Sequence, residues 1–472
     1  MLQKTGLKLS LRIATMHFPV VFLCVVLLNT IDSPATAAEW KAGVASVSIT
    51  PKEPIHLLGY PNRTKPFESV DQDIFAKALA IEDSEGHRGV IVTSDLVGFQ
   101  DAYAGAICDR ICELTKLQRG QIILNASHNH TGPLVTLDPM KQGNLAHGSM
   151  SDAEAQRTIA YSRELQDKIV KLVEDALADL RPAQLSWGKA KVDFVMNRRV
   201  GKAGAISMAA NPQGIADRTV PVLKIASPDG KLRGVLFGCA CHNTTLTPDH
   251  NLISGDYAGA AQELLQRKYP GAIALFMSGC GADANPEPRG GLDQVRQHGA
   301  ELADAVIHRL DGNLTAVHDP LHAAYKVVDL PLQHLTKDDI ARYIAIGNVQ
   351  SMMATHLKQL VDGGSKLPET YGAPVAVWRF GDGPTLVALP GEGVAGYVPL
   401  IEQRLKNRPL WISSYNNDCF GYLPTAQIVR EGGHETIGVT VWLWGNRFAN
   451  RAGFFSEDVE RTIIDAVAEL AK

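Results

Sequence analysis

The chain is organised around the stretch Gln121-Ile122-Ile123-Leu124-Asn125-Ala126-Ser127-His128-Asn129-His130-Thr131-Gly132-Pro133. An apolar, β-branched run that stops at a polar, glycine-containing turn predicts a buried strand whose last side chains reach a cleft. His128 and His130 are two residues apart, and on an extended chain this spacing places both rings on the same side. One ring could then bind a metal while the other faces a substrate. The alternative interpretation is a pair of satisfied surface histidines, and this stretch alone does not separate the two.

The first 38 residues have the pattern of a secretory signal. Lys4, Lys8 and Arg12 precede an apolar run over residues 18–28, and small residues follow over 35–38. This order is typical of a cleaved leader, and the run is too short to span a membrane. An uncleaved membrane anchor is the alternative. We therefore expect a secreted or periplasmic protein.

The composition of the chain is that of an ordinary globular protein. Of its 472 residues, 45% are hydrophobic and 20% are charged, which argues against disorder. The net charge is −4 and there is no basic block, so nucleic acid is not an expected partner. Of the seven cysteines, Cys24 lies in the leader, and the remaining six are too few for a disulfide-built scaffold of this length.

Alternating strand and helix patterns predict an α/β fold. Strands are expected over 75–82 and 89–95, and a helix separates them from the strand that carries His128. A long amphipathic helix is expected over 152–180, and 333–362 reads as helical and peripheral. We find no repeat and no clear linker. We therefore expect one large catalytic domain over residues 39–472, with mixed β-sheets flanked by helices.

Several expected strand ends carry side chains that can act on a metal or a proton. They are Asp95, His128, His130, His242, Asp283 and Glu392. Nitrogen and carboxylate ligands suit a catalytic zinc ion, which usually takes three protein ligands and leaves a position for water. Zinc lowers the pKa of that water to about 7. No spacing among these residues is as diagnostic as His-Glu-x-x-His, so local pattern alone indicates the zinc site only weakly.

Five stretches resemble, in the same order, the neutral, non-lysosomal ceramidases. The first, His128 to Pro133, looks like the His-Thr-His-Ser-Gly-Pro signature of that family. The others are Asn197-Arg198; Phe237 through His242 to Gly255-Asp256; Gly279 to Pro286; and Gly421 to Thr425 with the trailing Gly433-His434-Glu435. Together they extend from about Gly43 to near the C-terminus.

This resemblance implies a zinc-dependent hydrolase that cleaves an N-acyl amide bond, in ceramide or a related lipid, by metal-activated water. An ester substrate ranks second. Carried over residue by residue, the metal ligands would be His128, His242, Glu392 and Tyr422. A phenol ligates zinc well only when deprotonated, which the charge of the metal can promote. The partner would be a small-molecule or lipid amide, with peripheral membrane contact through that substrate.

The same resemblance assigns roles around the metal. His130 would hydrogen-bond the substrate or the developing oxyanion, and Arg198 would polarise the carbonyl or orient a neighbour. Asp95 would be a hydrogen-bond partner of a ligand histidine, and Asp283 would cap its loop. The plainer alternatives are an ordinary surface arginine at position 198 and, for Tyr422, an aromatic side chain packed beside its neighbour.

The chain departs from the ceramidases at two positions. In that family the glycine-rich loop continues Gly-Asp-Val-Ser-Pro, and its serine is essential; here Asn285 stands at that position. An amide can hydrogen-bond a substrate but cannot be a hydroxyl nucleophile. The tyrosine expected twelve residues after Tyr422 is His434, which could stabilise charge or shuttle a proton. The immunoglobulin-like domain that follows in ceramidases is not expected here.

These departures motivate a second hypothesis, a metal-binding homologue that has lost turnover. Hydrolysis of a phosphate or sulfate ester ranks last, because Glu392 is the only carboxylate among the proposed ligands. Under the first hypothesis, the candidate catalytic residues are His130, Arg198, Asn285 and His434. The sequence leaves open the metal, zinc against manganese or iron, and the oligomeric state.

Overall fold

The computed structural model describes residues 6, 8–10, 40–138, 150–202, 205–406, 408–439 and 451–472. The chain divides into two units, Met1–Ala37 and Ala38–Lys472, and the second unit is described below. The predicted signal segment lies almost wholly outside the described residues, so the boundary at residue 38 stays a prediction. Among the described residues, no helix combines the length and the apolar character needed to cross a membrane.

The larger sheet has nine strands in the order β12-β10-β9-β6-β1-β3-β4-β5, with β14 paired to β6. The strands are β1 (Trp40–Ser48), β3 (Phe75–Glu82), β4 (Arg88–Ser94), β5 (Ile122–Ala126), β6 (Arg181–Lys191), β9 (Thr219–Ala226), β10 (Leu232–Cys239), β12 (Ile273–Ser278) and β14 (Thr315–Val317). The β4–β5 and β10–β12 pairs are parallel and the other pairs are antiparallel. The sheet is therefore mixed.

The nine strands form two halves that fold toward each other. Strands β1 and β6 pair only through Trp40 to Ala42 with Arg181 to Ala183. Beyond this short junction, β12 of one half lies against β3, β4 and β5 of the other. The backbone N–H of Ser278 donates to Oδ1 of Asn125 at 3.0 Å, which holds the ends of β12 and β5 together. This contact brings the loop after each strand to one place.

A second sheet has four strands in the order β15-β16-β17-β19. They are β15 (Leu321–Pro331), β16 (Thr370–Phe380), β17 (Thr385–Ala388) and β19 (Leu410–Ser413). Three small ladders complete the strands: β2 (Ser69–Val70) with β11 (Leu252–Ile253); β7 (Val195–Lys202) with β8 (Ala205–Asn211) and β13 (Ala284–Pro286); and β18 (Glu392–Gly393) with β20 (Tyr422–Leu423).

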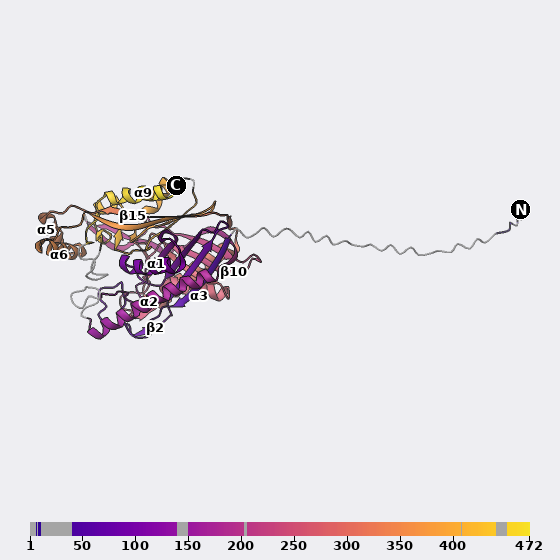
Figure 1. The fold of residues 1–472 in the computed structure, drawn as a ribbon, viewed down its shortest axis with the longest axis horizontal. Helices are drawn as coiled ribbons and strands as arrows, with labels where there is room; N and C mark the ends of the chain where they lie inside the picture. The colour runs from indigo at the N-terminus through magenta and orange to yellow at the C-terminus, as the bar shows by residue number, and fades with distance from the viewer. Residues whose placement is uncertain are drawn as a thin grey trace, which may run out of the picture. The chain divides into compact units, whose positions relative to one another are not determined.

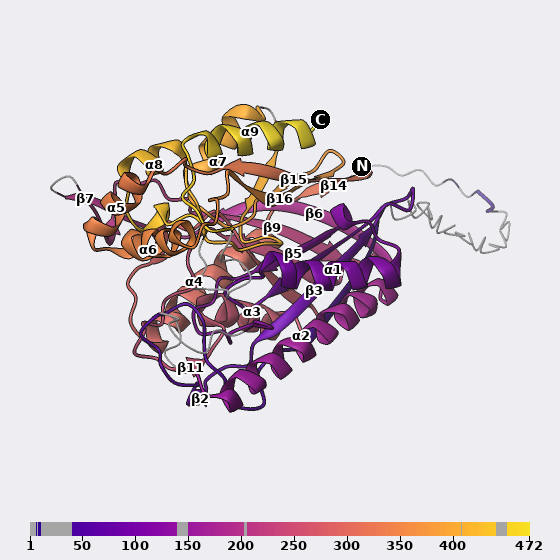
Figure 2. The same ribbon diagram turned by 60° about the vertical axis from the view of Figure 1, so that its left-hand side comes forward.

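Helices cover the outer faces of both sheets (Figures 1 and 2). The α-helices are α1 (Asp101–Thr115), α2 (Asp152–Ala178), α3 (Asp256–Lys268), α4 (Leu292–Asp311), α5 (Lys337–Ile346), α6 (Val349–Asp362), α7 (Tyr397–Arg404), α8 (Ala426–Glu431) and α9 (Asp458–Leu470); the short 3₁₀-helices are η1 (Arg119–Gln121) and η2 (His434–Thr436). Helices α1 and α2 pack on one half of the large sheet, and α3 and α4 pack on the other. Helices α7 and α9 pack on the four-stranded sheet. A shared core lies between the two sheets.

The predicted fold class is confirmed, with two local corrections. The helix expected over 152–180 is α2, which begins after a capping box between Ser151 and Glu154. The helical region expected over 333–362 is interrupted at Gly347, which has a φ of +71°. The extended chain expected at the two histidines is wrong, because His128 has a φ of +57°. The chain turns there, and the turn brings the two rings together.

Candidate metal centre

The first two side chains of the site follow strand β5, whose five residues are all buried. After β5 the backbone turns at His128, and the ring centroids of His128 and His130 lie 4.8 Å apart. The Nδ1 atom of His128 lies 2.9 Å from the carbonyl oxygen of Val97. This contact fixes the ring and directs Nε2 away from the backbone.

Two further side chains reach the same point from distant parts of the chain. The Nε2 atom of His128 lies 3.1 Å from Oε2 of Glu392, and the Nε2 atom of His242 lies 3.6 Å from the same oxygen. The Nε2 atom of His130 lies 3.2 Å from that of His128. Ligand atoms of the three histidines all lie within 4.8 Å of one another. His128 and His130 follow β5, His242 follows β10 and Glu392 begins β18, so three separate parts of the chain supply the four side chains.

The donor set fits a metal ion. The Nδ1 atoms of His128 and His242 each face a backbone carbonyl, of Val97 and Gly281, at 2.9 Å. Each Nδ1 therefore carries its hydrogen, and each Nε2 presents a lone pair. Among the described residues, Nε2 of His242 and Oε2 of Glu392 are buried and have no hydrogen-bond partner. Lone pairs that converge on a carboxylate repel one another unless a cation lies between them.

Burial favours the neutral imidazoles of His242 and His130. Burial, reinforced by the charge of Arg198, lowers the pKa of His242 well below its ordinary value. Burial and the neighbouring His128 do the same to the pKa of His130. A neutral imidazole is the form that binds a metal, so the environment favours ligation.

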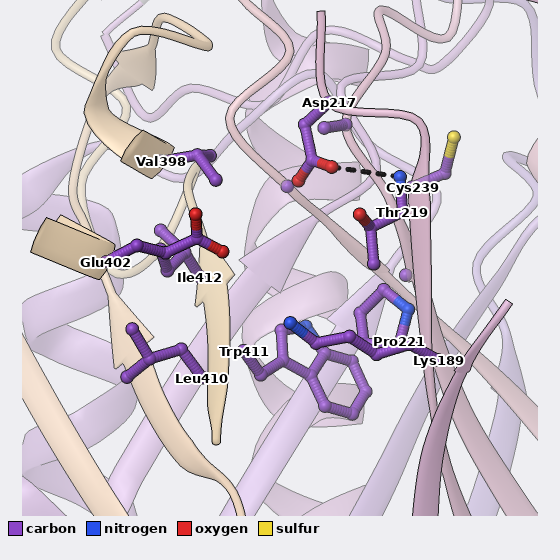
Figure 3. A pocket seen from close by; sticks show the side chains of 13 residues that line it. Lys189, Asp217, Thr219, Pro221, Cys239, Val398, Glu402, Leu410, Trp411 and Ile412 are labelled. Atoms are coloured by element: carbon purple, nitrogen blue, oxygen red, sulfur yellow. Dashed lines mark hydrogen bonds between the residues drawn. The ribbon is translucent and has the colours of Figure 1, made fainter. Parts of the chain in front are cut away.

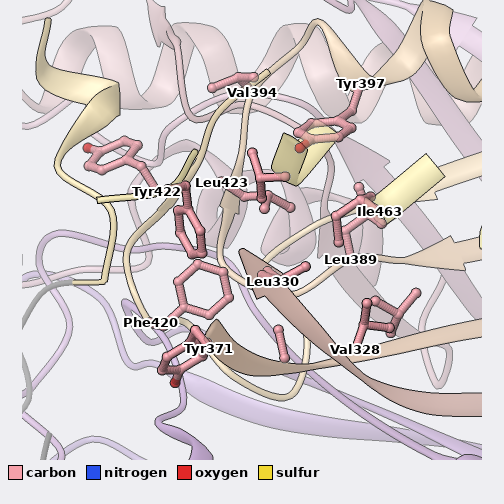
Figure 4. Packing of buried hydrophobic residues seen from close by; sticks show 14 of the residues in the cluster. Val328, Leu330, Tyr371, Leu389, Val394, Tyr397, Phe420, Tyr422, Leu423 and Ile463 are labelled. Carbon is pink, nitrogen blue, oxygen red and sulfur yellow. The ribbon is translucent and has the colours of Figure 1, made fainter. Parts of the chain in front are cut away.

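Tyr422 stands beside Glu392, because β18 and β20 pair with these two residues opposite each other. Its ring belongs to the core under the four-stranded sheet, as its plainer interpretation expects. Figure 4 shows its hydroxyl directed away from the other labelled side chains of that core. Nη2 of Arg198 donates to this hydroxyl at 3.0 Å. Burial, followed by the charge of Glu392, raises the pKa of Tyr422 well above its ordinary value.

Arg198 is buried rather than on the surface, so the interpretation as an ordinary surface arginine is wrong. Its Nε donates to Glu435 at 3.0 Å, and its Nη1 donates to Oδ1 of Asn285 at 3.3 Å. With the bond to Tyr422, the guanidinium contacts three partners of the site. Burial alone would lower the pKa of Arg198, but Tyr422 and Glu435 raise it above its ordinary value.

The remaining predicted residues also lie around this point. Asn285 is in β13, where its Oδ1 accepts from Arg198 and from Oγ1 of Thr244 at 3.5 Å. The ring of His434 lies 5.2 Å from that of Tyr422 and is perpendicular to it. Burial, followed by the charge of Arg198, lowers the pKa of His434 to about 4. The structure thus gathers all eight predicted site residues, and their individual roles stay predictions.

Asp95 does not take the predicted place beside a ligand histidine. Its carboxylate accepts from the backbone N–H of Phe75 at 2.8 Å and from Nε2 of Gln262 at 3.1 Å. The ligand histidines use backbone carbonyls instead. Asp283 accepts from the N–H of Ala395 at 2.7 Å, as expected of a carboxylate that orders a loop.

Two residues near the site were not assigned from the sequence. Glu435 is buried and binds both Arg198 and Arg199. It lies in the quoted stretch after Gly433, but nothing in the pattern shows that it faces two arginines. Cys419 has its Sγ within 4.8 Å of a nitrogen of His128 and an oxygen of Glu392. It carries no spacing signal that could have found it.

A separate small cavity lies beside the end of β10, the strand that leads to His242 (Figure 3). It is lined by Lys189, Asp217, Thr219, Pro221, Gly238, Cys239, Ala240, Gly279, Val398, Glu402, Leu410, Trp411 and Ile412. None of the predicted site residues lines it.

Residues 40–288 match the family described as neutral/alkaline non-lysosomal ceramidase, N-terminal. The chain belongs to this family. It is 24% identical to the neutral ceramidase of Pseudomonas aeruginosa over 251 residues, which are 50% of this chain and 35% of that protein. It is 23% identical to the neutral ceramidase of Drosophila melanogaster over 279 residues, which are 54% of this chain and 37% of that protein. The matches thus span little more than a third of either ceramidase.

The likeness of fold extends further than the likeness of sequence. The crystal structure of the Pseudomonas aeruginosa neutral ceramidase superposes with a TM-score of 0.69 at 18% identity, and the match covers 92% of this chain and 74% of that one. At this identity the match shows the ceramidase fold. Glu392 and Tyr422 lie outside the matched family segment, so the structure alone places Glu392 beside His128 and His242, and Tyr422 beside Glu392.

Proposed function

We propose that this protein is a zinc-dependent amide hydrolase that cleaves an N-acyl amide bond in a lipid or a related small molecule. The convergence of His128, His242 and Glu392 on one buried point carries the proposal. Membership of the ceramidase family supports the amide as the bond that is cleaved. The ceramidases named above give ceramide as one candidate substrate.

His128, His242, Glu392 and Tyr422 would hold the metal. When bound there, zinc would supply Lewis acidity toward a carbonyl and toward water. Zinc suits three imidazole or carboxylate ligands with a further position, and a phenol ligand loses its proton as the metal binds. The charge of Arg198 beside the phenol favours that loss.

The other residues would act on the substrate. His130 lies next to His128 with its Nδ1 buried and without a hydrogen-bond partner among the described residues, so it can bind a substrate group. His434 is neutral at pH 7, so it could accept the proton released by the attacking water and pass it to the leaving amine. Asn285 would orient a carbonyl or hydroxyl through its amide, since it cannot be a nucleophile.

The proposal is tested with purified protein and a panel of N-acyl amides that includes ceramide. We expect turnover that a chelator abolishes and zinc restores, and loss of turnover in His128→Ala. His308→Ala is the matched control, because His308 is an exposed histidine of α4. Turnover that survives both the chelator and His128→Ala would contradict a zinc-dependent hydrolase with His128 as a ligand.

A second candidate is a metal-binding homologue without turnover. It is favoured by Asn285, whose Oδ1 already accepts two hydrogen bonds within the protein. This candidate predicts zinc bound in stoichiometric amount and no hydrolysis of any amide or ester in the panel. Asn285→Ser, which restores the hydroxyl of the family, would then be expected to gain activity.

We also propose that the protein is exported. The proposal rests on the charged, apolar and small-residue order of residues 1–38. N-terminal sequencing of the protein from a cell envelope or culture fluid should find a start near residue 39. A retained Met1 in that fraction would contradict cleavage.

A further inference from the structure

Four arginines lie around the histidines, and two of them have no acidic partner among the described residues. Arg198 and Arg199 share Glu435, and Arg199 also binds Glu431. Neither Arg63 nor Arg289 forms an ion pair with any carboxylate of the described residues; their hydrogen bonds go to neutral groups. Residues 139–149, 203–204, 407 and 440–450 lie outside the described residues, and their sequence contains no Asp or Glu. The two arginines therefore lack a counter-ion within residues 40–472.

Arg63 is a buried cation, with 4% of its surface exposed. Its Nη1 donates to the carbonyl oxygen of His130, and its Nη2 donates to that of His250 at 2.7 Å. Its Nε is buried and has no hydrogen-bond partner among the described residues. Burial lowers the pKa of Arg63 to about 10. A buried guanidinium without a counter-ion is costly, which makes it a site for an anion.

Arg289 and Arg63 both contact Tyr60. The guanidinium of Arg63 lies 4.7 Å from the centre of the Tyr60 ring, and Nη2 of Arg289 donates to Oη of Tyr60 at 2.8 Å. The Nε of Arg289 is also buried and unpartnered within the described residues. The Tyr60 ring lies 4.8 Å from the ring of His130. Tyr60 and Arg289 are partly exposed, so the cluster reaches solvent at the metal centre.

We propose that Arg63 and Arg289 bind an anionic group of the substrate next to the scissile amide. The substrate class is then an N-acyl amine whose amine portion carries a carboxylate, sulfonate or phosphate. A guanidinium offers a planar fork of donors that matches these groups, whereas a neutral head group leaves both Nε donors unpaired. The anion site narrows the substrate class of the proposed hydrolase, and it rests on that proposed function for the position of the amide.

The test compares three lauroyl amides of equal acyl chain: N-lauroylethanolamine, which is neutral, N-lauroylglycine, a carboxylate, and N-lauroyltaurine, a sulfonate. Lauroyl phosphoethanolamine adds a phosphate. We expect kcat/KM about 10- to 100-fold higher for at least one anionic amide than for the neutral one, the range of one or two charge-assisted hydrogen bonds. Arg63→Gln and Arg289→Gln should each lower kcat/KM for the anionic amide more than for the neutral amide, and so reduce this ratio.

Arg379→Gln is the control, because Arg379 lies in β16, outside the site, and should leave the ratio unchanged. Arg63→Gln removes two hydrogen bonds to backbone carbonyls and could unfold its loop. If Arg63→Gln does not fold, the test of the anion site rests on Arg289→Gln alone, because Arg289 is partly exposed. A neutral amide cleaved as well as every anionic one, or an equal loss for all amides in Arg289→Gln, would overturn the anion site.

Calorimetric titration of metal-depleted protein separates this inference from the proposed function. We expect N-lauroyltaurine or another anionic amide to bind at least about 10-fold more tightly than the neutral amide, and Arg289→Gln to abolish the difference. If no amide is hydrolysed but this difference is found, the anion site stands and the hydrolase proposal fails. If the neutral amide is cleaved and no binding difference is found, the hydrolase stands and the anion site fails.

Discussion

The Nε2 atom of His128 lies 3.1 Å from Oε2 of Glu392, although the two residues are far apart in the chain. His128 follows β5 of the nine-stranded sheet, and Glu392 begins β18, which follows β17 of the four-stranded sheet. Asn125, in β5, donates to the carbonyl oxygen of Ser414 at 2.8 Å, which ties the two regions together. The site therefore depends on how the two sheets pack.

Loss of either ligand outside the histidine stretch should release the metal. Outer hydrogen-bond partners alone typically change metal affinity about 10- to 100-fold, so His242→Ala and Glu392→Gln should lower it at least as much. Metal content after dialysis against a weak chelator measures this directly. His308→Ala should keep the wild-type content, and a full complement of zinc in His242→Ala would contradict the ligand set.

Gly59→Ala should disturb His130 more than it disturbs the fold. A Cβ on Gly59 would lie 2.5 Å from Cγ of His130, and Gly59 has a φ of +111°. Gly86→Ala is the matched control, because Gly86 has a φ of +87° but no atom within 4 Å of its Cβ position. Both variants should lose about 1–3 kcal/mol of unfolding free energy through backbone strain. Only Gly59→Ala should also lose turnover; equal activity in both would contradict a role for His130.

Glu435→Gln should destabilise the protein strongly. Although burial alone would raise the pKa of Glu435, Arg198 and Arg199 lower it below its ordinary value, so the carboxylate is charged at pH 7. Its loss leaves two buried guanidinium groups without that charge, which typically costs about 3–5 kcal/mol. Urea unfolding measures the change. Glu431→Gln, at a half-exposed partner of Arg199, should stay within about 1 kcal/mol.

Asp418 should make stability depend on pH. Burial, followed by the charge of Asp101, raises its pKa to about 7 from an ordinary value of 3.8. The folded state therefore binds the proton more tightly than the unfolded state, and this contribution is complete below about pH 4 and lost as the pH rises to about 7. The unfolding free energy of the wild type minus that of Asp418→Asn should therefore fall as the pH rises through that window. A difference that does not change between pH 4 and pH 8 would contradict it.

Local patterns were enough for the elements that lead to the site. The buried run before Ser127 predicted β5, and the amphipathic pattern over 152–180 predicted α2, because each pattern depends on near neighbours in the chain. The left-handed backbone of His128 was not predicted, since a non-glycine residue with positive φ is held by its surroundings.

The sequence by itself determined the family, the α/β class and the set of side chains able to hold a metal. The family and the side chains follow from the ordered motifs, and the fold class follows from strand and helix periodicity. The tertiary structure decided that His128, His242 and Glu392 share one point and that carbonyls rather than Asp95 orient the histidines. It also decided that Arg63 and Arg289 form no ion pair within the part of the chain that the structure describes. Such contacts join residues far apart in the chain. They arise from the packing of two sheets, which no local pattern encodes.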